Sequence, residues 1–214
     1  MGQIVMVLGK SGSGKSASLR NFHDGEIGIF EVAGKRLPFR TDMKIAKVSS
    51  YRTIEHAISK GGMRAWCIDD AGYMMQFDNF AHADEGGYSK FVDMAKGFYG
   101  LLRSAMDTDD DTITYFLMHP EFDQMGHEHP KTIGRMLDEK LCVEGLFPIV
   151  LDCVTMADEN GRPRHVFVTE SDGKNLAKAP MGMFGAEEIP NDLKAVDSTI
   201  REYWGMAPLK DGKE

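Results

Sequence analysis

The feature that most constrains this chain is a glycine-rich stretch that directly follows an apolar segment near its start. Gln3–Leu8 reads QIVMVL, and residues 9–16 read GKSGSGKS. The first segment predicts a β-strand because its residues are apolar and several are β-branched. The second matches G-x-x-x-x-G-K-[ST], and a short helix is expected over residues 17–22. This order of strand, loop and helix predicts a loop that binds phosphate.

The residue types in this loop fit that chemistry. Glycines allow positive φ angles and bring backbone N–H groups close to phosphate oxygens. Lys15 can offer a charge to the β- and γ-phosphates, Ser16 can offer a hydroxyl to Mg²⁺, and a helix that opens near Lys15 adds its positive dipole end. The alternative is a Gly/Ser-rich turn that matches by chance. The predicted nucleotide-binding residues are Gly9, Lys10, Ser11, Gly12, Ser13, Gly14, Lys15, Ser16 and Ala17.

A second informative stretch ends in two adjacent carboxylates. Residues 63–68 read MRAWCI and lead into Asp69 and Asp70. Buried parallel strands read as apolar runs, and ligands collect at their carboxyl ends. Asp69 is therefore predicted to hold Mg²⁺, and Asp70 is predicted to polarise the attacking water. Glu31 is a more distant candidate for the base, and the alternative reading of the whole stretch is a strand that runs into an acidic turn.

A third apolar run ends at a histidine. Residues 112–118 read TITYFLM and are followed by His119. In this nucleotide-binding architecture, a polar residue at the end of the strand beside the phosphate loop senses the γ-phosphate, and His119 is predicted to occupy that position. A histidine that merely closes the strand is the alternative. Residues 124–130 (QMGHEHP) hold two more histidines and are predicted to form a mobile loop rather than a metal site.

The remaining elements follow from hydrophobic periodicity and turn residues. Helices are predicted over residues 51–60, 88–106 and 192–204, with Asn191 as the N-cap of the last. A hairpin is predicted from residues 27–32 to 36–39 with Gly34-Lys35 as its turn, and a surface excursion over 71–87 with a helix start at 73–75 as one option. A short helix or turn is predicted over 131–140, a strand over 147–154, and a return strand over 165–169 after the Asn160-Gly161 turn. The predicted fold is α/β, with one domain over residues 1–214, a frayed tail from about 206, a mostly parallel sheet flanked by helices, and an antiparallel C-terminal edge.

Composition limits the classes of function. The chain has 214 residues, of which 42% are apolar and 27% are charged, as in ordinary globular proteins. No apolar run is long enough to span a membrane, and the chain begins directly on a strand without a signal peptide, so a cytoplasmic location is expected. The three cysteines lack metal-type spacing and are predicted to be core residues. The net charge of −8 argues against a surface coated with nucleic acid but leaves room for a local basic groove.

These motifs together resemble a family of small phage-encoded ATPases. The resemblance covers GKSGSGKS, RAWCIDD, TYFLMHPE, and the segments KTIGRMLDEKL, FPIVLDCV and GKNLAKAPMGMF. Members of that family have a RecA-like P-loop NTPase core, are grouped with AAA-type ATP-binding proteins, and are grouped with single-strand-annealing recombinases. The resemblance implies ATP and Mg²⁺ as cofactors, hydrolysis of ATP, and a role in phage DNA recombination or replication with single-stranded DNA as partner. It also implies the host cytoplasm as location.

The resemblance carries over to single positions. Lys15 and Ser16 match the phosphate and magnesium positions, Asp69 matches the metal carboxylate, and His119 matches the sensor. One departure concerns the base, because Asp70 stands where many such ATPases have a glutamate. RecA-like assemblies often complete the site with a basic residue from the adjacent subunit of a homo-oligomer, and the candidates here are Lys131, Arg135, Lys174 and Lys178. A basic hairpin loop that would permit DNA binding contains Arg162, Arg164, Lys174 and Lys178.

Two other functional classes stay open. A nucleotide-dependent switch or accessory protein would bind ATP and hydrolyse it slowly, and the shorter Asp70 favours this reading. A small-molecule kinase of the phosphate-loop type would need a lid rich in arginine and a substrate site near the first helix. Arg20 lies in that helix, but no clustered lid arginines follow it. Turnover separates the two, because a kinase consumes ATP only with its acceptor.

Overall fold

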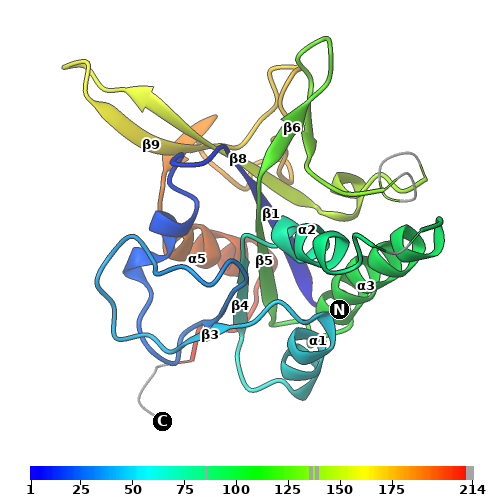
Figure 1. Ribbon diagram of the computed structural model, residues 1–214. Coiled ribbons are helices and arrows are strands. Elements are labelled where there is room, and N and C mark those ends of the chain that lie inside the picture. The colour runs from blue at the N-terminus through cyan, green and yellow to red at the C-terminus, as the bar shows by residue number, and fades with distance from the viewer. Residues whose placement is uncertain (85, 135–136, 138–139, 211–214) are drawn as a thin grey trace.

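A sheet of eight strands runs through the centre of the molecule, in the order β10-β9-β8-β1-β5-β4-β2-β3 (Figure 1). The computed structural model describes residues 1–84, 86–134, 137 and 140–210. The strands of this sheet are β1 (Gln3–Leu8), β2 (Gly28–Glu31), β3 (Ile45–Lys47), β4 (Ala65–Asp69), β5 (Ile113–Met118), β8 (Ile149–Ala157), β9 (Pro163–Val168) and β10 (Glu188–Pro190). A separate two-stranded sheet joins β6 (Pro120–Phe122) to β7 (Glu128–Pro130).

In this order, the six strands from β8 to β3 pair in parallel. At the other end of the sheet, β9 and β10 are antiparallel to their neighbours. β1 pairs with β5 and β8, β4 pairs with β5 and β2, and β2 pairs with β3, all in parallel register. β9 pairs antiparallel with β8 and with β10. The predicted α/β class, mostly parallel sheet and antiparallel C-terminal edge are therefore confirmed.

Helices cover both faces of the sheet, so the molecule has three layers. One face carries α1 (Tyr51–Lys60), α2 (Gly72–Ala81) and α3 (Ser89–Met106). The other carries the 3₁₀ helix η1 (Ser16–Asn21) and α5 (Leu193–Trp204). A further 3₁₀ turn, η2 (Glu144–Leu146), precedes β8. No helix in the described part of the chain is long and apolar enough to cross a membrane.

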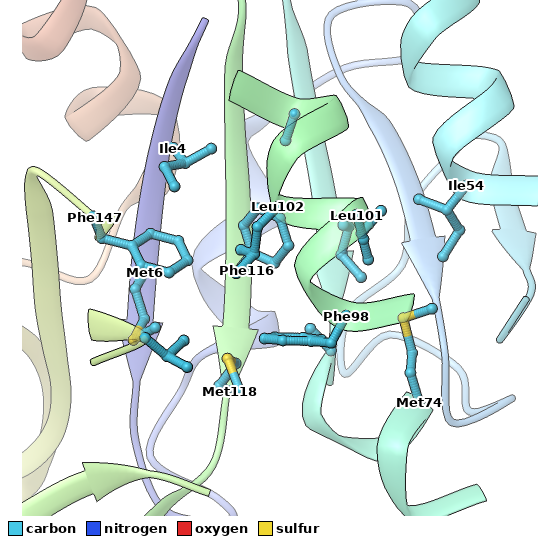
Figure 2. Close-up of a cluster of buried hydrophobic side chains, with 14 of the residues drawn as sticks. Ile4, Met6, Ile54, Met74, Phe98, Leu101, Leu102, Phe116, Met118 and Phe147 are labelled. Atoms are coloured by element: carbon cyan, nitrogen blue, oxygen red, sulfur yellow. The ribbon is translucent and has the colours of Figure 1, made fainter. Parts of the chain in front are cut away.

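The alternation of side chains along β1 divides the apolar residues between two cores. Ile4, Met6 and Leu8 belong to the core beneath α3, whereas Val5 and Val7 belong to the core beneath α5. Figure 2 shows the first core, where side chains of α3 lie over side chains of β5 and Met6 lies beside Phe147. Both faces of β1 are thus buried, as expected for a central parallel strand. This packing holds the carboxyl end of β1, where the glycine-rich loop begins, in a fixed position.

Several short elements differ from the predictions. Residues 36–39 form no strand, so the predicted hairpin is wrong; β2 instead pairs in parallel with β3, which lies further along the chain. Residues 124–130 are not simply a loop, because 128–130 form β7 of the β6–β7 hairpin. The segment 71–87 contains the helix α2, whose Met74 and Met75 are buried. These short strands carry too few residues for a clear period-2 pattern.

The C-terminal helix and tail also need correction. The N-cap of α5 is Asp192, whose carboxylate accepts hydrogen bonds from two backbone N–H groups of the first turn, whereas Asn191 lies one residue earlier. Within the predicted frayed tail, residues 206 and 207 are hydrogen-bonded to the rest of the chain. The N–H of Met206 donates to the carbonyl oxygen of Arg201, and the N–H of Ala207 donates to Asp111. These bonds tie the segment to the amino-terminal edge of the sheet.

Candidate functional site

The predicted site residues lie where parallel strands end at one edge of the sheet. Strands β1, β5, β4 and β2 are neighbours and run in the same direction. Their carboxyl ends therefore place Gly9, His119, Asp70 and Glu31 along one edge. In Figure 1 the β6–β7 and β8–β9 hairpins both project from this edge. Ligands collect at such an edge in α/β proteins.

The glycine-rich loop shows why glycines are needed, for two different reasons. Gly12 and Gly14 have φ angles of 81° and 104°, in the region that favours glycine. A Cβ at Gly14 would also lie 2.8 Å from the ring of His165. Gly9 was expected at positive φ but is not among the residues with positive φ. Its requirement is steric, because a Cβ there would lie 2.6 Å from the carbonyl oxygen of Cys153.

The loop leaves backbone donors free. Within the described residues, the N–H groups of Gly12, Gly14 and Lys15 donate to no protein acceptor. Consecutive free N–H groups in such a loop form an anion-binding concavity. The short helix expected here is a six-residue 3₁₀ helix. The free N–H groups at its start and Lys15 would supply the attraction for phosphate.

Lys15 is buried, not exposed on a loop. Its Nζ donates to the carbonyl oxygens of Gly9, at 2.7 Å, and Lys10, at 3.2 Å. Burial lowers the pKa of Lys15, while the nearby carboxylates Asp69 and Asp70 favour its charged form. The same Nζ lies 3.5 Å from Nδ1 of His119. The predicted phosphate lysine and the predicted sensor histidine are thus neighbours, although they are far apart in the sequence.

Ser16 and Asp69 also meet. The Oγ of Ser16 donates to Oδ1 of Asp69 over 3.0 Å. Burial raises the pKa of Asp69 to about 6, against the opposing effect of that hydrogen bond. A hydroxyl and a carboxylate side by side are ligands that suit Mg²⁺, which usually keeps waters and substrate phosphates as its other ligands. In the described part of the chain, no group of three or more His, Cys, Asp or Glu side chains could hold a metal ion.

Asp70 follows Asp69 in the chain, and both of its carboxylate oxygens contact other side chains. Oδ2 forms an ion pair with Lys35, and Oδ1 lies 3.2 Å from Nε2 of His119. Burial alone would raise the pKa of Asp70, but hydrogen bonds from His119 and Lys35 outweigh it and lower the pKa to about 2. Asp70 is also the one described non-glycine residue with positive φ, at 60°. A carboxylate with so low a pKa is a poor general base.

Glu31 differs from Asp70 in its partners and in the direction of its pKa shift. It ends β2, in register with Asp69 on β4. Its side chain is buried, with 2% of its surface exposed, and Oε2 has no hydrogen-bond partner among the described residues. Burial raises the pKa of Glu31. A buried carboxylate with a free oxygen and a raised pKa is a common arrangement for a group that accepts a proton.

These groups surround one cavity of about 340 Å³. Its lining joins the glycine-rich loop, the ends of β2, β4 and β5, and the segment after β2. The charged and aromatic side chains that line it are Lys15, Glu31, Lys35, Arg36, Asp69, Asp70, Tyr73, His119 and His165. A larger cavity, of about 640 Å³, lies on the other side of the loop and contains Glu128, Asp152 and Lys174. The predicted phosphate residues Lys10 and Ser13 line only the larger cavity, whereas Ser11 and Gly12 line both. The smaller cavity is lined by Lys15, Ser16 and Asp69, and we therefore take it as the candidate site.

The other predicted residues lie apart from this cavity. Lys174 lines the larger cavity, and Nζ of Lys178 donates to the carbonyl oxygen of Glu144 over 2.9 Å. Arg164 pairs with Glu188 at 2.8 Å. Lys131 is exposed, and Arg162 lies at the tip of the β8–β9 hairpin. Arg135 lies outside the described residues.

Other predictions concern structural side chains. Arg20 donates to the backbone carbonyl of Asn191 over 2.6 Å, so its guanidinium anchors η1 to the segment before α5. A kinase substrate near the first helix would therefore compete with Asn191 for this guanidinium. Cys67 and Cys153 are buried, as predicted, but Cys142 is exposed.

Sequence reasoning missed four charged or aromatic side chains of the cavity. Lys35 was assigned to a hairpin turn, Arg36 to the strand after it, Tyr73 to the start of a helix, and His165 to a return strand. The ring of Tyr73 lies edge-on to His119, with centroids 5.7 Å apart, and Nζ of Lys35 lies 5.6 Å from the centroid of the Tyr73 ring. The only usable signal was position, since Lys35 follows the strand that ends at Glu31 by four residues.

No protein-family model matches the chain, and a search of curated proteins also finds no match.

Proposed function

We propose that this protein binds ATP with Mg²⁺ in the cavity at the carboxyl edge of the sheet and hydrolyses it. The observation that carries the proposal is the convergence of groups from separate strands. Lys15 and Ser16 follow β1, Asp69 ends β4, and His119 follows β5; Ser16 lies 3.0 Å from Asp69 and Lys15 lies 3.5 Å from His119. Phosphoryl transfer needs such positioning and charge more than covalent chemistry.

Each side chain has a role that suits its surroundings. The free N–H groups of the loop and Lys15 hold the β- and γ-phosphates. Ser16 and Asp69 hold Mg²⁺, which would neutralise charge on the phosphate oxygens when bound. His119 lies beside Lys15 and is placed to contact the terminal phosphate. Lys15 already donates to two carbonyl oxygens, so phosphate would compete with these for its protons.

Glu31 is the better candidate for the base that accepts the proton of the attacking water. Its pKa is raised by burial, and one carboxylate oxygen is free of protein partners within the described chain. Asp70 was the first candidate from sequence, but its oxygens contact Lys35 and His119. We therefore assign Asp70 to the orientation of His119 and Glu31 to proton transfer.

The strand order supports a RecA-like P-loop core as part of the proposal. The strand that ends at His119 lies between the strand of the glycine-rich loop and the strand that ends at Asp69. This is the position that a sensor residue needs to lie beside the phosphate loop. The sheet order and the resemblance to phage ATPases lead to the same assignment by separate routes.

A role in phage DNA recombination or replication, with single-stranded DNA as partner, rests on the resemblance. Arg162 and exposed Lys174 could contact DNA phosphates, but Arg164 and Lys178 are engaged with protein acceptors. Binding to DNA would be sensitive to salt, because Lys and Arg contacts release counterions. Measurement of ATP hydrolysis with and without single-stranded DNA, at two salt concentrations, tests this part.

The core of the proposal is tested by nucleotide binding and turnover. We expect the protein to bind ATP in a Mg²⁺-dependent manner and to release phosphate, with both properties lost in Lys15→Ala. Binding without turnover would indicate the nucleotide switch instead. Turnover only in the presence of a small acceptor would indicate a kinase. Absence of ATP binding by the wild-type protein, under conditions where its thermal unfolding is cooperative, would reject the proposal.

A further inference from the structure

We propose that Lys35 supplies, from the same chain, the positive charge that stabilises the phosphoryl group during transfer. This inference rests on the proposed ATP hydrolysis. In that reaction the oxygen of water bonds to the γ-phosphorus, the bond from this phosphorus to the β–γ bridging oxygen breaks, and its electron pair stays on ADP. The proton of the water passes to Glu31. Charge grows on the phosphate oxygens, and a cation nearby lowers the barrier.

Lys35 is joined to the phosphate lysine by a continuous chain of contacts. Its Nζ forms an ion pair with Oδ2 of Asp70, and Oδ1 of Asp70 lies 3.2 Å from Nε2 of His119. Nδ1 of His119 lies 3.5 Å from Nζ of Lys15. All four side chains line the same cavity. Lys35 therefore belongs to the group of side chains that surrounds the terminal phosphate in the proposed function.

The two partners of the Lys35–Asp70 pair differ in exposure. The side chain of Lys35 is 59% exposed, whereas that of Asp70 is 4% exposed. Asp70 is held in place and Lys35 reaches it from the mouth of the cavity, so a long, flexible lysine can turn from the carboxylate to a phosphate oxygen. The hydrogen bond to Asp70 raises the pKa of Lys35, so it stays charged at neutral pH.

Two contacts restrain the segment that carries Lys35. Nζ of Lys47, on β3, donates to the carbonyl oxygen of Gly34 over 2.9 Å. The ring of Tyr73, from α2, lies beneath the Lys35 ammonium at 5.6 Å. These contacts limit where the ammonium can go and keep it near the cavity.

The residues expected to act from a neighbouring subunit offer no comparable geometry. Lys178 is engaged with Glu144, and Lys174 lines the other cavity. Lys131 is exposed and does not line the candidate cavity. With Lys35 in this role, the proposed reaction needs no basic residue in trans.

The first test compares Lys35→Ala and Lys35→Gln with wild type, with Lys44→Ala as the matched control. Lys44 lies on the same segment, is 91% exposed and, among the described residues, forms an ion pair with Asp24 alone, at 3.7 Å. We expect kcat to fall about 10²- to 10³-fold in both Lys35 variants, at or below the lower end of the about 10³- to 10⁵-fold effect of arginine fingers. Affinity for ADP, which lacks the γ-phosphate, should stay within about twofold. Lys35→Arg should recover part of kcat, and Lys44→Ala should match wild type.

A second readout is binding of the transition-state analogue formed by ADP, Mg²⁺ and aluminium fluoride. The wild-type protein should bind this analogue more tightly than ADP alone. In Lys35→Ala, the ratio of the two affinities should fall at least tenfold. Loss of ADP affinity in both Lys35 variants would assign Lys35 to ground-state binding and overturn the proposal. Unchanged kcat in a folded Lys35→Ala protein would overturn it as well.

Mixing separates a cation from the same chain from one in trans. Equal amounts of Lys15→Ala and Lys35→Ala should show no recovery of turnover, because each chain would lack one group of its own site. Recovery toward a quarter to a half of wild-type activity would mean that Lys35 acts across subunits, which would reject the proposal. If the wild-type protein binds no ATP, the proposed function is rejected and this inference with it. If the wild-type protein hydrolyses ATP, the outcomes above test the role of Lys35 alone.

Discussion

Glu31 and Asp69 lie opposite each other in register at the carboxyl ends of the parallel strands β2 and β4. Both side chains are buried, and burial raises the pKa of each. Asp69 accepts a hydrogen bond from Ser16, while Oε2 of Glu31 has no partner within the described residues. Two neighbouring carboxylates in different surroundings can take different roles, one as a metal ligand and one as a base.

The first prediction separates the two candidates for the base. Glu31→Gln should lower kcat about 10²- to 10⁴-fold, the range of a general base, while ATP affinity changes little. Asp70→Asn should lower kcat less, because it weakens the contacts to His119 and Lys35 without removing the proton acceptor. Single-turnover hydrolysis and equilibrium binding of ATP measure both. Equal turnover of Glu31→Gln and wild type would assign the base elsewhere.

The second prediction concerns the metal. Asp69→Asn should raise the Mg²⁺ concentration required for half-maximal turnover at least tenfold, because an amide oxygen replaces a charged ligand. Ser16→Ala should do the same, and Ser16→Thr should keep wild-type behaviour since the hydroxyl remains. Titration of activity with Mg²⁺ at saturating ATP gives the result. An unchanged Mg²⁺ requirement in Asp69→Asn would remove this residue from the metal site.

The third prediction concerns Lys15. Lys15→Ala should weaken ATP binding about 100-fold or more, because it removes a charge-assisted contact to phosphate. The fold should persist, since the lost contacts go to carbonyl oxygens of Gly9 and Lys10 and to the ring of His119, and none of them joins core side chains. Calorimetric ATP titration and circular dichroism test the two statements. Lys96→Ala is the control, because Lys96 is exposed on α3 and forms an exposed ion pair with Asp93 at 3.7 Å.

The fourth prediction is a pH dependence of stability. Glu128 is buried, and burial raises its pKa from 4.5 to about 7. The folded protein therefore retains a proton that the unfolded chain releases between these two values, so the free energy of unfolding falls as pH rises from 4.5 to about 7. Glu128→Gln, which stays neutral, should add about 1–3 kcal/mol at pH 8 and little at pH 4.5. Thermal unfolding at both pH values measures this.

The control for that prediction is Glu121→Gln on β6, directly beside β7. Glu121 is exposed, so its replacement should change stability by less than about 0.5 kcal/mol at either pH. Equal stabilisation by Glu128→Gln at pH 4.5 and pH 8 would contradict a raised pKa for Glu128.

The fifth prediction tests a buried network that connects α5 to the sheet. Asp197 is fully buried, pairs with Arg201 and accepts a hydrogen bond from Tyr115 over 2.8 Å. Asp197→Ala leaves the guanidinium buried without its counter-ion and should cost about 3–5 kcal/mol. Asp107→Ala breaks an exposed pair with Arg103 and should cost less than about 1 kcal/mol. Chemical denaturation compares the two, and similar losses would contradict the prediction.

Long elements were predictable because their patterns are local. The apolar runs of β1, β4 and β5 and the helical period of α3 were recognised close to their observed bounds. The short strands were not, because β3, β6, β7 and β10 have three residues each. Their existence depends on pairing with segments elsewhere in the chain, which a local pattern does not contain.

The sequence by itself determined the parallel α/β architecture, the glycine-rich loop and the residues that follow the strand ends. These depend on residue type and spacing alone: glycine where φ is positive, and apolar runs where both faces of a strand are buried. Only the tertiary structure decided how each polar group is used. Asp70 and Glu31 are both acidic residues at strand ends, yet one contacts Lys35 and His119 while the other keeps a free oxygen. Burial and partners come from segments distant in the sequence, and they set the charge and availability of each side chain.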